Sequence, residues 1–558
     1  MPLNAMLQSS AAARFAVLLA ALSAAFLLPA AGAPAASDNR LTVKGPPSAV
    51  PTFQCLGLYL PCAGDANENA SVLVRYRRAG EAAWREGPPL VSCETPREFR
   101  GSLFGLVSGA TYEIELEARD PDGVAGEAKA AFSARTLDEK FPVVRTIRIA
   151  AGTRAEPLVI DLSGTARGYV LYAPAEGGKA TIDVAGKHPA CVVIRPGTSY
   201  VIVRGLRLLN AAHHGVDASG AHHLVIERCE IAGWGRPGGN EKEGDMDAGV
   251  YARQRGRDAP VSDLVIQDNH IHAPRGDTNS WQESKRHPAG PQGITLVETD
   301  GRHILRYNRI EGDAKHWFND GIGGGWNDTD RGSPHRDSDI HGNEIRYCRD
   351  DAVESEGGNV NVRIWGNRLA NTYTGVALAP VRRGPAYVLR NVITDFDECA
   401  FKLGWPENHS VGPLFIFHNT AVEPSRGAAG LEDAGGPYRR IVTRNNILAV
   451  GGRPIYDRAK EVASDYDHDF FPPEPGLVAP GKPEPHAVRA PKPGFVRPET
   501  GDFSLAPGSP ALDRGLPLPG LNDGFRGKAP DLGALEQGDP TPRYGPRTEA
   551  GSAPVRER

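Results

Sequence analysis

One short phrase recurs along most of this chain and strongly limits what it can fold into. In this phrase a few aliphatic or β-branched residues precede two variable residues, an asparagine, one more variable residue, and Ile, Leu or Val. Three successive copies contain Asn343, Asn367 and Asn391, which are 24 residues apart. Repetition at a fixed period indicates a solenoid, in which each repeat buries its apolar face only against its neighbours.

Further copies of the phrase extend this solenoid in both directions. They contain Asn269 and Asn308, and looser copies centre on Leu206, Cys229, Asn419 and Asn446. Alternating aliphatic residues with Gly and Asn at turns favour strands, and the sequence lacks a long amphipathic helix. We therefore predict an all-β chain whose main body, residues 144–536, is a right-handed parallel β-helix. The recurrent asparagines are expected to stack, to hydrogen-bond along the ladder and to tolerate left-handed backbone.

The region before this body, residues 41–137, has a different pattern. Its short alternating strands, such as Ser71 to Tyr76, predict a small antiparallel β-sandwich. The segment Gly105 to Tyr112, followed by Ala118-Arg119-Asp120, resembles the penultimate strand region of fibronectin type III domains. That resemblance implies a fibronectin type III-like module.

The two ends of the chain carry signals of their own. Arg14, an apolar run from Phe15 to Leu28, and Ala31-Gly32-Ala33 have the layout of a signal peptide over residues 1–33. We therefore expect a secreted or periplasmic protein without a membrane span in the mature chain, since no later segment is long and apolar enough. The polar, proline-rich residues 537–558 are predicted to be a disordered tail.

Composition narrows the range of partners. With 63 Lys and Arg against 68 Asp and Glu, the formal charge is −5, so nothing favours nucleic-acid binding. We expect a monomer that acts on a polysaccharide. Seven cysteines in an exported chain permit disulfides, and Cys55 and Cys62 are the expected pair.

A second ladder runs through the coils and carries the functional candidates. Each copy has a small residue, a buried apolar residue and then a residue that must face outward, because successive side chains of a strand alternate. The outward row is Asp217, Tyr251, Thr295, Gly323, Glu354, Ala377 and Lys402.

Four carboxylates are predicted to gather on this face. Neighbouring coils lie about 4.8 Å apart, so Asp320, Asp351, Glu354 and Glu356 should form one patch, with Lys402 about 10 Å from Glu354. Gly323, Gly324, Gly325 and Ala377 leave room above the patch, as in the floor of a groove. Carboxylates packed so closely either share protons or hold a hard cation, and Ca²⁺ suits several oxygen ligands.

Two segments on this face resemble the family 9 polysaccharide lyases, which are β-helix pectate lyases. Asp350-Asp351-Ala352-Val353-Glu354 resembles their Asp-Asp-x-x-Asp calcium motif, and Ala400-Phe401-Lys402-Leu403-Gly404 resembles the strand that carries their lysine base. The chain departs from the family in Glu354, Ala352 and Ala400, and in an insertion around Trp317 to Arg336. The predicted Ca²⁺ ligands are Asp320, Asp350, Asp351, Glu354 and Glu356.

The resemblance implies β-elimination on a uronate, with Lys402 as the base and Asp351 and Glu354 in the catalytic centre. Ca²⁺ is required in this hypothesis, since uncompensated carboxylates would raise the pKa of the lysine. Arg382 is expected to assist catalysis, and Arg383 to bind a substrate carboxylate. The residues expected to bind sugar rings are Trp326, Tyr373 and Trp405.

Two other functions stay open from the sequence. In a glycoside hydrolase, two of Asp320, Asp351, Glu354 and Glu356 would act as acid and as base or nucleophile. In a non-catalytic glycan-binding or surface protein, no metal-dependent turnover would occur and Lys402 would affect no activity.

Overall fold

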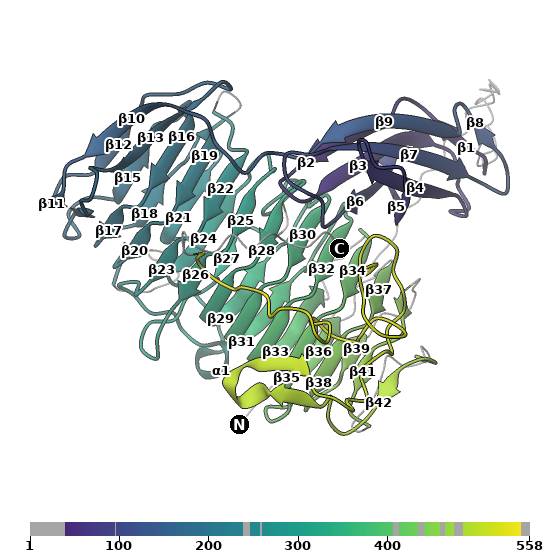
Figure 1. Cartoon of the computed structure of the whole chain (residues 1–558). Helices are drawn as coiled ribbons and strands as arrows, with labels where there is room; N and C mark the ends of the chain where they lie inside the picture. Colours follow the sequence, from purple (N-terminus) through teal and green to yellow (C-terminus); the bar gives the residue numbers. More distant parts are fainter. Residues whose placement is uncertain are drawn as a thin grey trace, which may run out of the picture. The chain divides into compact units, whose positions relative to one another are not determined.

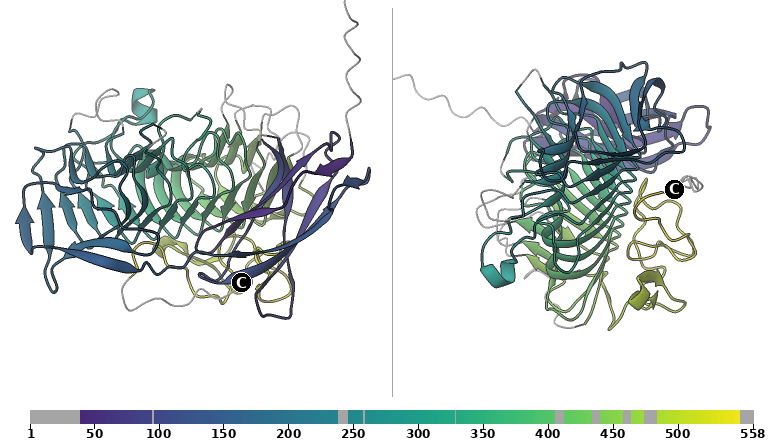
Figure 2. Two further views of the ribbon diagram at one scale, coloured as in Figure 1. Left: turned by 90° about the horizontal axis from the view of Figure 1, so that it is seen from above. Right: turned by 90° about the vertical axis from the view of Figure 1, so that its left-hand side faces the viewer.

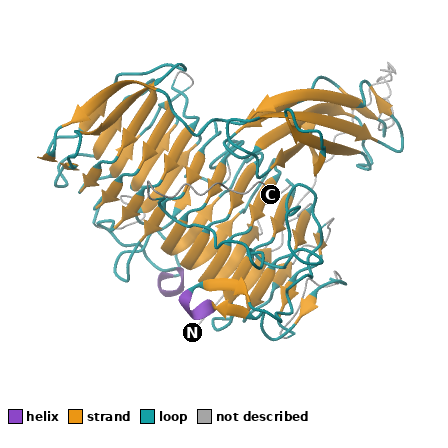
Figure 3. Cartoon of the chain, viewed as in Figure 1, coloured by secondary structure: helices purple, strands orange, loops and turns teal. Residues whose placement is uncertain are grey.

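The computed structural model describes residues 39–94, 96–237, 246–256, 259–327, 329–404, 412–433, 440–457, 464–473 and 484–547. Residues Asn39–Arg558 form one compact unit, and the predicted signal peptide lies outside the described residues. Strands dominate the described chain (Figure 3), with one short helix, α1 (Trp281–Ser284), and one 3-10 turn, η1 (Pro498–Thr500). No helix among the described residues is long and apolar enough to cross a membrane.

The first region is a nine-stranded, mostly antiparallel sheet. Its strand path β8-β1-β3-β6-β5-β4-β7-β9 has β2 paired to β3, and β5 pairs with β4 near its start and with β6 near its end. The alternating side chains bury one apolar core that includes Leu58, Val74 and Ile114. The strands are β1 (Leu41–Val43), β2 (Ser48–Pro51), β3 (Leu56–Ala63), β4 (Ser71–Arg78), β5 (Arg85–Glu94), β6 (Arg97–Leu103), β7 (Thr111–Arg119), β8 (Val124–Ala125) and β9 (Lys129–Arg135). The fibronectin-like identity of this region stays a prediction.

The body is the predicted right-handed parallel β-helix, with strands stacked coil on coil (Figure 1). One face is a 12-stranded parallel sheet with a strand from each coil. Its members are β10 (Val143–Ile149), β13 (Tyr169–Pro174), β16 (Ser199–Arg204), β19 (His222–Glu227), β22 (Leu264–Gln267), β25 (Ile304–Arg306), β28 (Asp339–His341), β30 (Val362–Trp365), β32 (Ala386–Leu389), β34 (Leu414–Phe417), β37 (Ile441–Arg444) and β40 (Asp465–Tyr466).

A 21-stranded sheet completes the coils (Figure 2). In the early coils it consists of two ladders, each with one strand per coil. The first contains β11 (Gly152–Arg154), β14 (Ala180–Asp183), β17 (Arg207–Leu209), β20 (Glu230–Ala232), β23 (His270–His272) and β26 (Arg309–Glu311). The second contains β12 (Leu158–Ile160), β15 (Ala190–Ile194), β18 (His214–Asp217), β21 (Ala248–Arg253), β24 (Gln292–Val297) and β27 (Ile322–Gly323).

The two ladders merge in the middle coils, and this change positions the candidate site. There each coil has one long strand that serves both ladders: β29 (Glu344–Glu354), β31 (Arg368–Ala377) and β33 (Val392–Gly404). Between Cys348 and Asp351 the pairing of β29 with β31 shifts by one residue, which is a β-bulge. A bulge reorients side chains and bends its strand, so the strict alternation assumed from the sequence fails here.

The last coils separate the ladders again. They contain β35 (Thr420–Glu423), β36 (Ala429–Asp433), β38 (Ile447–Val450), β39 (Ile455–Asp457), β41 (Phe470–Phe471) and β42 (Val488–Arg489). A hairpin of β43 (Phe495–Arg497) and β44 (Asp502–Leu505) packs apolar side chains against this end, for example Leu505 against the cluster of Ile447 and Phe470.

The predicted asparagine ladder is confirmed. Asn269, Asn308, Asn343, Asn367, Asn391, Asn419 and Asn446 are buried, and the side-chain oxygen of each accepts from the backbone N–H of the residue at that position in the preceding coil. The left-handed residue is not the asparagine but the one before it, as in Tyr307 (φ 53°) and Gly366 (φ 60°). The asparagine itself stays available for stacking.

Two predictions need correction: the Cys55–Cys62 disulfide and the disordered C-terminal tail. All seven cysteines are free and buried, and Cys55 and Cys62 form no disulfide. Cys55 directly precedes β3 and Cys62 lies near its end, and the two side chains are buried in different apolar clusters. The expected tail is not detached over its described part, since Gly545 N–H bonds Gly342 O at 2.9 Å and the Arg547 guanidinium bonds Asp268. Residues 548–558 lie outside the described residues.

The free energy of unfolding should decrease as pH falls below the pKa of an unfolded histidine, because His303 is buried in the folded chain. Burial lowers its pKa to about 3; its Nδ1 accepts from Leu264 N–H (3.3 Å) and its Nε2 lies 2.8 Å from Thr299 Oγ1. Because the unfolded histidine titrates near 6.5, its stabilisation is complete above that pH and is lost as pH falls toward 3. The loss at pH ~4.5 is about 2–3 kcal/mol.

Denaturant unfolding of wild type and His303→Asn at several pH values measures this slope. The asparagine retains an acceptor but cannot titrate, so its stability should fall less between pH ~6.5 and ~4.5. His316→Asn, at an exposed turn, is the matched control and should keep the wild-type slope. Equal slopes for wild type and His303→Asn would contradict the assignment.

Candidate active site

The register of the second ladder agrees with the sequence prediction. Asp217 pairs with Tyr251, Tyr251 with Thr295, and Thr295 with Gly323. Farther along, Glu354 pairs with Ala377, and Ala377 with Lys402. The apolar residues beside this row, such as Val353 and Phe401, are fully buried. Ile322 pairs with Val353, which aligns the following residues Gly323 and Glu354, so the outward row runs from Asp217 to Lys402.

Three carboxylates converge where β27 and β29 lie side by side. Asp320 precedes β27, Asp351 follows the bulge in β29, and Glu354 ends that strand. One oxygen from each lies within 4.8 Å of the others, and Asp320 Oδ1 also accepts from Asp351 N–H at 3.2 Å. The predicted gathering of these three side chains is thus present.

Lys402 reaches this cluster from two strands away. Its Nζ donates to Asp351 Oδ2 at 2.9 Å and lies 3.5 Å from Glu356 Oε1. The intervening residue of the row is Ala377, whose methyl group leaves the space that the lysine crosses. The small residue in the sequence pattern is what permits this contact.

Glu356 lies beside the cluster rather than within it. Its Oε1 accepts from Ala379 N–H at 3.2 Å and faces Lys402, whereas its Oε2 is buried without a hydrogen-bond partner among the described residues. Burial raises the pKa of Glu356 to about 8, although Lys402 acts in the opposite direction.

The clustered carboxylates of this site would be stabilised by a further positive charge. Burial, followed by the neighbouring carboxylates, raises the pKa of Asp320 well above its usual range. The pKa of Asp351 is raised by burial against the effect of Lys402. Burial alone would lower the pKa of Lys402, but the charges of Asp351 and Glu356 outweigh it and raise that pKa. Without another cation, the lysine keeps its proton.

A hard cation fits these residues. The donor set is three carboxylates, the ligand type that Ca²⁺ prefers, and Asp351 Oδ1 is buried without a hydrogen-bond partner among the described residues. Asp320, Asp351 and Glu354 are the residues that would hold it.

Asp350, also predicted as a ligand, has other partners. Its Oδ1 accepts from Trp281 Nε1 at 3.0 Å, and its Oδ2 lies 3.3 Å from His287 Nε2. Both partners belong to the polar segment that contains α1. The bulge lies between Cys348 and Asp351, and there the side chains of Asp350 and Asp351 are directed at different neighbours.

The predicted sugar-binding residues are distributed around the cluster. Tyr373 stacks on Trp281, with ring centroids 6.1 Å apart. Trp326 is 77% exposed and lines a small surface pocket together with Glu354 and Glu356. Trp405 lies outside the described residues.

The predicted arginines lie in the turn after Val381. This turn is one coil from Gly357, which pairs with Val381 and whose carbonyl accepts from Arg382 N–H at 2.9 Å. Both arginines are half-buried, and the charge of Arg383 acts on His335. Substrate binding by this pair stays a prediction.

Glu398 is a site residue that the sequence analysis missed. Burial, and then the charge of Glu432, raise its pKa to about 7, and it hydrogen-bonds Tyr373. A second register shift, between Thr372 and Thr374 of β31, offsets the pairing with β33 here. Glu398 lies four positions before Lys402, so strict alternation already places both side chains on one face, and this spacing was the signal that the sequence analysis overlooked.

Comparison with known proteins finds similarity only among solved structures. No protein-family description matches the chain, and no curated protein matches it. A pectate lyase, Pel9A, aligns at TM-score 0.38 and 15% identity over 71% of this chain and 86% of its own. The Dettilon tailspike protein gp208 aligns at TM-score 0.38 and 18% identity, over 57% of this chain and 62% of its own. A family 28 exopolygalacturonase from Yersinia enterocolitica aligns at TM-score 0.34 and 10% identity, over 80% and 98%.

Proposed function

We propose that this chain is an exported, Ca²⁺-assisted lyase that cleaves a uronate-containing polysaccharide by β-elimination. The observation that carries the proposal is the convergence of Asp320, Asp351 and Glu354 with the Lys402 ammonium 2.9 Å from Asp351. Clustered buried carboxylates around one lysine are costly for folding, and such arrangements are typical of functional sites. Gly323 and Ala377 keep the surface above them low enough for an extended ligand.

Each residue of the site has a distinct role in the proposed elimination. When bound at the three carboxylates, Ca²⁺ would neutralise a substrate carboxylate and so acidify the neighbouring C–H group. Lys402 Nζ, once neutral, takes that proton. The C–H electron pair forms the new C=C bond, the glycosidic C–O bond breaks, and the leaving oxygen takes a proton from water. Arg382 and Arg383 are the proposed carboxylate-binding residues.

The protonated state of Lys402 makes the cation essential to this proposal. Its partners Asp351 and Glu356 raise its pKa while their charge is uncompensated. A divalent cation among the same carboxylates removes that effect, because it competes with the lysine for their charge. Elimination should therefore stop when the cation is removed.

A decisive experiment follows the ultraviolet absorbance of the unsaturated uronate product. The purified chain is incubated with a panel of uronate polymers, with Ca²⁺ and again with a chelator. We expect absorbance to rise only with Ca²⁺ and to recover when Ca²⁺ is restored. New reducing ends without a rise in absorbance would contradict elimination and indicate hydrolysis. Polymer binding without any cleavage would exclude both the lyase and the hydrolase.

Hydrolysis is the second candidate because one observation favours it. Glu356 has a pKa of about 8 and borders the pocket that contains Glu354 and Trp326. A buried carboxyl group whose pKa is raised can act as the general acid of a glycoside hydrolase. In that case activity should depend on Glu356 and persist in chelator.

A further inference from the structure

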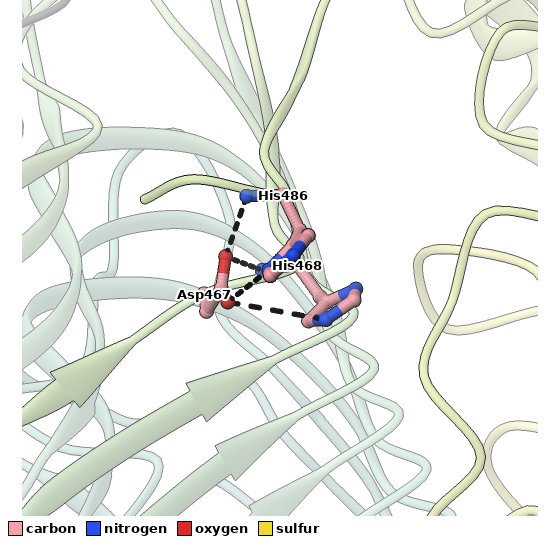
Figure 4. A group of neighbouring side chains, drawn as sticks. All are labelled: Asp467, His468 and His486. Atoms are coloured by element: carbon pink, nitrogen blue, oxygen red, sulfur yellow. Dashed lines mark hydrogen bonds and ion pairs between the residues drawn. The ribbon is translucent and has the colours of Figure 1, made fainter. Parts of the chain in front are cut away.

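A second cluster of ligand-type side chains lies at the C-terminal end of the β-helix, far along the chain from the candidate active site. It consists of Asp467, His468 and His486 (Figure 4). Asp467 and His468 lie between β40 and β41, and His486 lies just before β42. Because β41 pairs with β42, the cluster joins the last two strands of the 21-stranded sheet.

The Asp467 carboxylate is oriented by its backbone contacts. Its Oδ1 accepts from the N–H groups of His468 and His486, each at 2.9 Å. Its Oδ2 is thereby directed at the imidazoles, 2.6 Å from His486 Nδ1 and 3.9 Å from His468 Nε2. One oxygen thus fixes the geometry while the other remains available as a ligand.

The two rings are held together by the fold. They stack with centroids 4.7 Å apart and planes 14° from parallel. His468 has a left-handed backbone (φ 60°) and precedes Asp469, the residue that continues the asparagine ladder. That turn position directs its side chain out of the coil. Both rings therefore lie beside the Asp467 carboxylate, and His486 hydrogen-bonds it.

The distances are close to those of a zinc site. Tetrahedral ligands about 2.0–2.1 Å from Zn²⁺ lie about 3.4 Å from one another, and the observed 2.6 and 3.9 Å bracket this separation. Two imidazoles and one carboxylate suit Zn²⁺ far better than Ca²⁺, which takes oxygen ligands.

An independent observation comes from Glu484, two residues before His486. Glu484 is 7% exposed, and both carboxylate oxygens lack a hydrogen-bond partner among the described residues. The charges of Asp469 and Asp467 act on this carboxyl group, so it lies beside the cluster. A buried polar group without a partner is costly, and a nearby cation would relieve that cost.

We propose that Asp467 Oδ2, His468 Nε2 and His486 Nδ1 bind one Zn²⁺ ion that clamps the last two strands of the solenoid. The ion replaces the proton shared by Asp467 and His486, which is released to solvent. His486 is 62% exposed, so solvent reaches the remaining coordination position. Solenoids need a closed terminal repeat, and this clamp supplies it without a covalent link.

The test is zinc titration of the full chain after chelator treatment, by calorimetry and by metal analysis after dialysis. We expect one equivalent to bind with Kd of about 1 μM or tighter, and zinc to raise the melting temperature. His486→Ala and His468→Ala should each weaken binding by at least about 30-fold. Since His486 is on an exposed turn, its variant should keep the wild-type circular dichroism spectrum.

Two control variants locate the ion. His316→Ala removes a comparable exposed histidine that lies 3.3 Å from Asp313 but has no second imidazole, and zinc affinity should be unchanged. Asp351→Asn alters the candidate active site and should also leave zinc binding unchanged. Absence of saturable zinc binding to wild type would overturn the proposal, as would wild-type zinc affinity in both His486→Ala and His468→Ala.

Discussion

Replacing Lys402 by alanine should lower the rate of uronate elimination by about a thousand-fold, the range lost with a general base. The Nζ group is the proton acceptor in the proposed reaction and lies 2.9 Å from Asp351 Oδ2. Initial rates from product absorbance at saturating Ca²⁺ measure the effect.

The Lys402→Arg variant distinguishes the role of Lys402 as a proton acceptor from the role of its positive charge. Arginine retains the positive charge beside Asp351 and Glu356, but it does not give up its proton near neutral pH. It should preserve the melting temperature better than alanine while remaining as inactive. Lys315→Ala, at an exposed turn, is the control and should keep wild-type rates. Near-normal elimination by Lys402→Arg would remove this residue from the role of base.

Replacing Asn367 by alanine should cost about 3–5 kcal/mol of unfolding free energy, because several buried polar groups lose their partners together. Its Oδ1 accepts from Asn343 N–H and Nδ2, both at 3.0 Å. Its Nδ2 donates to Ile340 O and Asn391 Oδ1, both at 2.9 Å. The site is fully buried, so water cannot replace these contacts. Denaturant midpoints at constant slope measure the change.

The matched control for this substitution is Asn67→Ala in an exposed turn. Asn67 donates a single exposed hydrogen bond, to Asp122 at 2.8 Å. Its loss should change stability by no more than about 0.5 kcal/mol. If both variants lose similar amounts, the ladder contributes little and the apolar interior alone holds the coils together.

The order of the coils was predictable because a solenoid is a local structure. Each repeat pairs with the next, so the 24-residue spacing from Asn343 to Asn367 was enough to set their register. The outward row from Asp217 to Lys402 followed from the same spacing and from alternation, and the pairing agrees with it throughout. The three converging carboxylates were predictable for the same reason.

Deviations from alternation were not predictable from spacing. The bulge after Cys348 assigns Asp350 to Trp281 and His287. A one-residue shift reverses which face a side chain occupies, and the residue types in these strands do not indicate where such a shift occurs. The distribution of ligands within the acidic segment therefore depended on backbone geometry.

By itself, the sequence determined the β-helix, its asparagine ladder, the face that bears the acidic residues, and Lys402 on that face. Only the tertiary structure decided that Lys402 crosses Ala377 to reach Asp351, and that His486 meets Asp467 and His468. The physical reason is one of range. Periodicity fixes contacts between equivalent positions of adjacent coils, whereas side-chain reach, bulges and chain returns depend on the folded path.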